Sequence, residues 1–171
     1  DLKLLANRSD LYSVMNFARE IKTLFGKEIN IPDSITDIKA YAFYHCKNIK
    51  NIHISNKLKI IQDYAFSNCS SLLEVDIPDS VTNVRASAFQ DCSSLTNVKL
   101  SNKLESIGTY SFAGCSSLKE ISLPDSLVTV DKYAFSDCKN LTEIKIPNSY
   151  TNILSGTFAY CAKLKYVYLN S

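Results

Sequence analysis

The chain has 171 residues, of which 46% are apolar, so it is long enough to bury a continuous core within one domain. The 19 basic and 17 acidic residues are interspersed and leave a net charge of +2, which excludes a basic arm or an acidic tail. No apolar stretch approaches the ~20 residues of a membrane span, and no signal-peptide pattern is present. Because the chain starts at Asp1 rather than Met, we expect a processed product or a fragment.

Residues 1–28 form the first predicted unit, an N-terminal helical cap. Apolar residues from Leu11 to Phe25 recur at spacings of three and four, which predicts an amphipathic helix from about Asp10 to Gly26. Its single apolar side suits a lid over the first coil of a repeat structure. A membrane-surface helix is the weaker alternative for the same pattern.

Residues 29–171 repeat with a period of 23 residues. Residues at the same place in successive repeats form a column, and the two columns without any exception are one of cysteine and one of phenylalanine. The two columns are Cys46, Cys69, Cys92, Cys115, Cys138, Cys161 and Phe43, Phe66, Phe89, Phe112, Phe135, Phe158. One coil of this length cannot bury its own apolar side, so we expect neighbouring coils to stack in register, ~4.8 Å apart. The sequence therefore predicts one solenoid domain of about six repeats.

Each repeat carries the same predicted elements in the same order. The phrase L-x-x-I-x-I ends in alternating apolar residues, such as Val75 and Ile77, which predicts a main strand with one buried face. "PDS" or "SNK" then predicts a turn, and a pair such as Val81 and Val84 predicts a shorter second strand. The "YAF" segment and the cysteine predict a short helical turn. The expected fold class is therefore α/β.

The cysteine of each repeat is predicted to be a structural core residue whose thiol meets a turn carbonyl. Disulfides between successive coils are the alternative. However, side chains in register hold their Cβ atoms farther apart than the ~3.8 Å that separates the two Cβ atoms of a typical disulfide. A linear ladder of thiols cannot converge on zinc, and six equivalent cysteines with only His45 and His53 in the chain do not indicate a nucleophile. We therefore predict no catalytic residue, no metal and no cofactor.

The stretch "CSSLLEVDIPDSVTNVRASAFQDC", from Cys69 to Cys92, resembles the BspA-like leucine-rich repeats, which occur in surface proteins of host-associated bacteria and some protozoan parasites. The resemblance covers about residues 29–171, with departures at Ser111, Tyr150 and Thr157. It implies a curved, right-handed solenoid whose parallel main sheet lines the concave side. It also implies adhesion or protein binding, and a secreted or cell-surface location, although free buried thiols also suit the cytoplasm.

A binding surface is expected on the exposed positions of the main strands. These positions are Glu28, Asn30, Asn51, His53, Glu74, Asp76, Asn97, Lys99, Glu120, Ser122, Glu143, Lys145, Tyr166 and Tyr168. Carboxylates outnumber lysines among them, which argues against a nucleic-acid partner. Tyr166 and Tyr168 are the best candidate anchors for a protein or glycoprotein ligand. A plain solvated sheet surface, with Lys99 beside Glu74 or Glu120, is the alternative.

The last predicted strand, "YVYLNS", has no capping segment after it. An uncovered parallel strand leaves backbone groups unpaired, so we expect either further chain beyond Ser171 or contact with another chain. The favoured function is an adhesion-type binding module, with host extracellular-matrix proteins among the candidate partners and no membrane insertion by this segment. The alternative is a non-catalytic scaffold that assembles end to end or spaces other domains.

Overall fold

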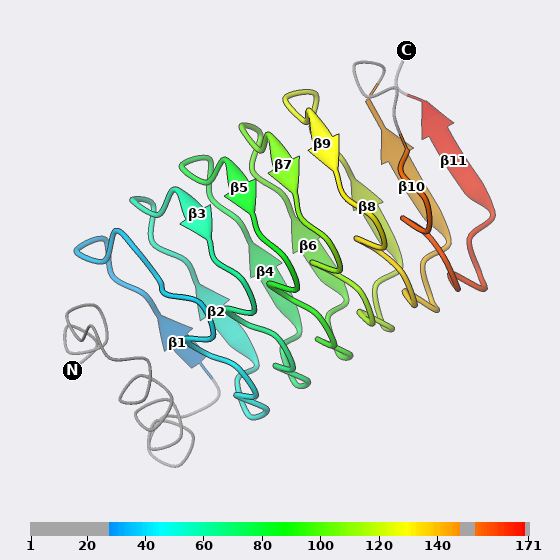
Figure 1. Ribbon diagram of the computed structural model, residues 1–171. Helices are drawn as coiled ribbons and strands as arrows, with labels where there is room; N and C mark the ends of the chain where they lie inside the picture. Colours follow the sequence, from blue (N-terminus) through cyan, green and yellow to red (C-terminus); the bar gives the residue numbers. More distant parts are fainter. Residues whose placement is uncertain (1–27, 148–152, 170–171) are drawn as a thin grey trace.

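The computed structural model describes residues 28–147 and 153–169 as a parallel β-solenoid of about six turns, each ~23 residues long. The coils follow one another along one axis, so that each coil contacts its neighbours in the sequence (Figure 1). The predicted helical cap, Asp10–Gly26, lies outside the described residues. Within the two described ranges, no helix is long and apolar enough to cross a membrane.

The predicted main strands are confirmed. They are β1 (Glu28–Asn30), β2 (Asn51–His53), β4 (Glu74–Asp76), β6 (Asn97–Lys99), β8 (Glu120–Ser122), β10 (Glu143–Ile146) and β11 (Tyr166–Leu169). Parallel neighbours pair in register at the 23-residue step, for example Ile29 with Ile52 and Ile52 with Val75. In β4, Val75 is buried while Glu74 and Asp76 are exposed, as strand alternation requires.

The shorter second strands are also confirmed. They are β3 (Ile60–Ile61), β5 (Asn83–Val84), β7 (Ser106–Ile107) and β9 (Thr129–Val130), which form one four-stranded parallel sheet. This sheet forms a second row beside the main strands (Figure 1). Its buried residues, such as Val84 and Ile107, face the same core as the main sheet. The four coils that begin with β2, β4, β6 and β8 thus each contribute two strands to one shared interior.

The predicted helical turns are wrong, because the described residues contain consecutive turns and no helix. In the coil around Phe66, Tyr64 and Asn68 adopt left-handed φ angles of 56° and 60°, which an α-helix excludes. The Phe66 N–H donates to the carbonyl of Ala88 in the next coil at 2.8 Å, while the Ser67 N–H donates three residues back to Tyr64. Alternate amides therefore build a third ladder of hydrogen bonds between coils.

The alternation of "PDS" and "SNK" turns has a physical cause. Asp33 Oδ1 accepts the Asn56 N–H at 2.9 Å, and Asp79 Oδ1 accepts the Asn102 N–H at 2.8 Å, each from the following coil. The hydrogen bond from the Asn102 amide lowers the pKa of Asp79. An aspartate in one coil thus stabilises the turn of the next.

The core is a single cluster that runs through the described coils. Phe66, Phe89, Phe112 and Phe135 are fully buried, and their rings are stacked with centroids 5.2 to 5.4 Å apart. The column ends at Phe158, which is only partly buried. The repeated phenylalanine therefore provides the contact that joins each coil to the next.

Candidate functional site

The exposed side chains of the main strands form one surface, here called the main-sheet face. Strand register places them in two columns across β1, β2, β4 and β6 and in two columns across β8, β10 and β11. The 23-residue period matches the columns of the two groups. The first column is Glu28, Asn51, Glu74, Asn97, Glu120, Glu143 and Tyr166; the second is Asn30, His53, Asp76, Lys99, Ser122, Lys145 and Tyr168. All predicted binding residues therefore lie on this one face.

One ion pair on this face differs from the expected pairing. Lys99 Nζ donates to Asp76 Oδ2 at 2.9 Å, rather than to Glu74 or Glu120. The reason is register, because Asp76 and Lys99 are directly opposite and belong to the same column. This hydrogen bond raises the pKa of Lys99. Both side chains are exposed, so the pair contributes little to stability.

The main sheet is interrupted between β6 and β8. Strands β1, β2, β4 and β6 form one sheet and β8, β10 and β11 form another, so no ladder joins β6 to β8 within residues 28–147. The second sheet stays continuous here through β7 and β9, and the Phe112 N–H still bonds to Ala134 at 2.8 Å. The coils are therefore held together on two sides and parted on the main-sheet face.

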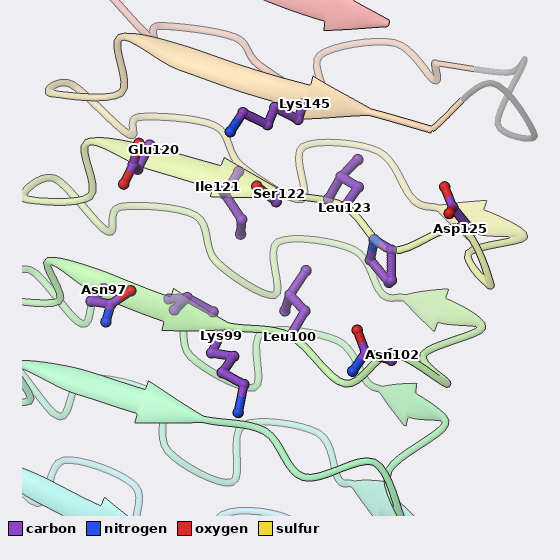
Figure 2. Close-up of a pocket in the computed structure, with 12 residues that line it drawn as sticks. Asn97, Lys99, Leu100, Asn102, Glu120, Ile121, Ser122, Leu123, Asp125 and Lys145 are labelled. Carbon is purple, nitrogen blue, oxygen red and sulfur yellow. The ribbon is translucent and has the colours of Figure 1, made fainter. Parts of the chain in front are cut away.

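A hollow of about 630 Å³ occupies this break. Figure 2 shows Asn97 and Lys99 on β6, on one side of the hollow, and Glu120 and Ser122 on β8, on the other side. The side chain of Lys145 extends toward the hollow from β10. The Lys99 side chain turns away from the break toward β4, as its pairing with Asp76 requires. Amide, hydroxyl, carboxylate and ammonium groups are therefore gathered around exposed strand edges.

Sequence reasoning missed the break, and the sequence carries no signal for it. Val98, Leu100, Ile121 and Leu123 keep the apolar pattern of every other coil. Burial does not mark it either, because Val98 is 7% exposed while the matching Ile52, which is paired on both sides, is 8% exposed.

Tyr166 and Tyr168 lie together at the last described strand. Their side chains are 55% and 45% exposed, and the ring centroids are 6.1 Å apart. Between them, Val167 is 53% exposed, whereas the matching Ile144 is fully buried. The aromatic pair is therefore available as an anchor, beside an apolar residue that the next coil would cover in a longer stack.

The cysteine column has the structural role that was predicted. The thiol of Cys92 donates to the Phe66 carbonyl in the preceding coil, with an Sγ to oxygen distance of 3.3 Å, and Cys69, Cys115, Cys138 and Cys161 repeat this bond. Burial raises the pKa of Cys92 to about 12, and burial also raises the pKa of Cys69 and Cys115. These thiols are therefore held neutral, the reverse of what a nucleophile needs.

Cys161 is expected to react with iodoacetamide well before the other described cysteines. It is only partly buried, whereas the other described cysteines are buried. Its thiolate can also accept a hydrogen bond from the neighbouring Cys138 thiol, which lowers the pKa of Cys161. Mass spectrometry of the native chain after timed alkylation measures the order. Equal modification of Cys161 and Cys92 in folded protein would contradict this expectation.

Comparison with known proteins gives the family and the fold. Residues 22–113 and 82–171 match the family described as "BspA type Leucine rich repeat region", in six copies. The fold is similar to a leucine-rich repeat protein of T. pallidum, at 28% identity and a TM-score of 0.82, over 84% of this chain and 69% of that one. No curated protein matches the sequence.

Two further solved structures share the fold at lower identity. A leucine-rich cell surface protein from Faecalibacterium prausnitzii is 19% identical with a TM-score of 0.58, over 85% of this chain and 60% of that one. A leucine-rich repeat protein from Eubacterium ventriosum is 23% identical with a TM-score of 0.65, over 83% of this chain and 43% of that one. The chain thus spans between 43% and 69% of the length of these three proteins.

Proposed function

This chain belongs to the family of BspA type leucine-rich repeat proteins, and we propose that it is a protein-binding module of a secreted or cell-surface adhesion-type protein. The proposed partner is a protein or glycoprotein, with host extracellular-matrix proteins as the first candidates. The proposal includes a right-handed coil with the main sheet on its concave side. Repeats of this family are typically non-catalytic, and we assign no catalytic residue, cofactor or nucleic-acid partner.

The observation that carries the proposal is the arrangement of the main-sheet face. It presents exposed polar columns across successive strands, and a hollow at the break between β6 and β8 interrupts them. The exposed Tyr166 and Tyr168 supply the aromatic contact area that protein interfaces favour. The F. prausnitzii protein of the same fold is described as a cell surface protein, which agrees with the proposed location.

A second candidate function is end-to-end assembly through the C-terminal edge strand, β11. It is favoured by Val167 and Ile153, which are 53% and 51% exposed on the last described coil. An apolar flank beside an unpaired strand edge invites another coil, from the same protein or from a second copy. Such a module would space or join other domains and need no ligand on the main-sheet face.

The chain is expected to bind saturably to at least one member of a panel of immobilised extracellular-matrix and serum proteins. A variant with Tyr166→Ala, Tyr168→Ala and Glu120→Lys should bind at least about tenfold more weakly, because buried aromatic anchors dominate interface energy. Surface plasmon resonance gives both affinities.

The matched control is Tyr160→Asn, which removes a 75% exposed tyrosine outside the main-sheet face. Asn68 shows that asparagine fits the same left-handed position, so this variant should fold and bind normally. Binding that is equally weak in both variants would refute the main-sheet face as the site. A wild-type chain that binds no panel member, and sediments as an end-to-end oligomer dispersed by Val167→Lys, would favour the second candidate.

A further inference from the structure

A second polar hollow lies among the turn segments of three successive coils. Its volume is about 300 Å³, and its lining includes Gln90, Asp91, Tyr110, Asp137 and Lys139 but no residue of the main-sheet face. This volume is at the lower end of the ~300–1,000 Å³ that small-molecule sites span. It is therefore a separate candidate site.

Gly114 lies in the middle of the lining of this hollow. It occupies the second left-handed position of its coil, where neighbouring coils carry Asp91 and Asp137 with φ angles of 57° and 56°. A Cβ atom at Gly114 would lie 2.3 Å from Asp91 Oδ1, so the carboxylate of Asp91 occupies the space that a side chain would take. The missing side chain thus lets the Asp91 carboxylate lie against Gly114, so the hollow has one carboxylate in the coil before Gly114 and one in the coil after it.

These two carboxylates have unused acceptor capacity. Within the described residues, no hydrogen bond or ion pair reaches the side-chain oxygens of Asp91 or Asp137. Gln90 and Lys139 supply donors in the same hollow. No three acidic, histidine or cysteine residues of the described chain are grouped as metal ligands, and two unpaired carboxylates disfavour an anion.

Tyr110 adds an apolar wall. It is 40% exposed, and its ring stacks on Tyr133 with centroids 5.1 Å apart and planes 7° apart, so its orientation is fixed. The preceding coil carries Ser87 at this position, so no ring covers the other face of Tyr110. A rigid aromatic beside carboxylate, amide and ammonium groups suits a ligand with both hydroxyl groups and C–H faces.

We propose that this turn-side hollow binds a neutral pyranose, such as the terminal hexose of a glycan. The sugar hydroxyls donate to Asp91 and Asp137 and accept from Lys139, while a C–H face of the ring packs against Tyr110. The site is separate from the main-sheet face, so it adds carbohydrate recognition to protein recognition and does not depend on it.

The test uses ¹⁵N-labelled full chain and four probes: the methyl glycosides of glucose, galactose, mannose and N-acetylglucosamine. At least one probe should shift the amide resonances of Asp91, Gly114 and Asp137. Asp91→Asn should weaken the dissociation constant at least about tenfold, because hydrogen bonds to charged groups are the strong ones. Gly114→Asn should do the same by displacing the Asp91 carboxylate, because a Cβ atom at this position would lie 2.3 Å from Asp91 Oδ1. Asn68 shows that asparagine adopts this left-handed backbone.

His45→Asn is the matched control, since it changes the same column of left-handed residues outside the hollow. Its affinity for the probe should equal that of the wild-type chain. Unshifted amides with all four probes, or undiminished binding by Gly114→Asn, would overturn the proposal. Shifts of the same amides by calcium chloride, without any response to the glycosides, would instead assign a cation and equally overturn it.

Discussion

Replacing Phe89 with alanine is expected to lower the free energy of unfolding by about 3–5 kcal/mol. The Phe89 side chain is fully buried, and its ring stacks on Phe66 at 5.2 Å and on Phe112 at 5.3 Å. Its loss leaves a cavity at both interfaces of one coil, and in a solenoid stability is carried by interfaces between nearest neighbours. Urea unfolding followed by far-UV circular dichroism measures the change.

The control for this prediction is the same substitution at the end of the column. Phe158 is partly buried and stacks on one described ring, that of Phe135, at 5.7 Å. Phe158→Ala should therefore cost less than half as much as Phe89→Ala. Equal losses of unfolding free energy in Phe89→Ala and Phe158→Ala would mean that the stability of the central coils does not depend on the stacked phenylalanine rings.

Much of this fold could be predicted from the period of the sequence. A side chain that recurs every 23 residues must occupy the same place in each coil, so the columns of Val75 and Phe66 predict a strand and a core stack without further information. The same argument predicted that the Cys92 thiol would meet a turn carbonyl, and the structure confirms it.

The turns were predicted wrongly although part of the signal was present. Asn68, Asp91, Gly114 and Asp137 share one column, and these residue types favour left-handed backbone, which ends a helix. The other left-handed column carries this signal only at Gly156, because its remaining residues are Ser87 and tyrosines such as Tyr64, and tyrosine rarely adopts a positive φ. Here the hydrogen bonds to the next coil outweigh the local preference.

The candidate site was only partly predictable. Alternation along a strand places Glu120 and Ser122 on the exposed face, and this needs only the local pattern. The break beside them is a relation between two whole coils, those of β6 and β8, which no single position of the sequence encodes. The hollow at Gly114 depends likewise on where the Asp91 carboxylate lies in the neighbouring coil.

The thiol column is expected to make the protein sensitive to alkali. Burial raises the pKa of Cys92 to about 12, and burial also raises the pKa of Cys69 and Cys115, whereas thiols in an unfolded chain ionise near pH ~8.5 to 9. Below that range the thiols are protonated in both states, so their contribution to stability is fully present. As the pH rises further, the unfolded chain loses protons that the folded chain keeps, and the free energy of unfolding falls.

Each such thiol contributes a slope of about 1.4 kcal/mol per pH unit, so three together give about 4 kcal/mol per pH unit from pH ~9 upward, for as long as all three stay protonated in the folded chain. A domain of ordinary stability, ~5–15 kcal/mol, should therefore unfold within about 1 to 4 pH units above pH ~9. Urea titrations at a series of alkaline pH values measure the slope.

Two cysteine variants separate this effect from general alkaline denaturation. Cys92→Ala removes one thiol of raised pKa, so the alkaline slope should become shallower by about 1.4 kcal/mol per pH unit, even though the variant is less stable at pH 7. Cys161→Ala removes the partly buried thiol, whose pKa is lowered because its thiolate can accept a hydrogen bond from Cys138, so the alkaline slope should remain as steep as in the wild-type chain. Identical slopes in Cys92→Ala and the wild-type chain would show that the buried thiols ionise without unfolding the coil. The cysteine column would then not be the cause of unfolding at alkaline pH.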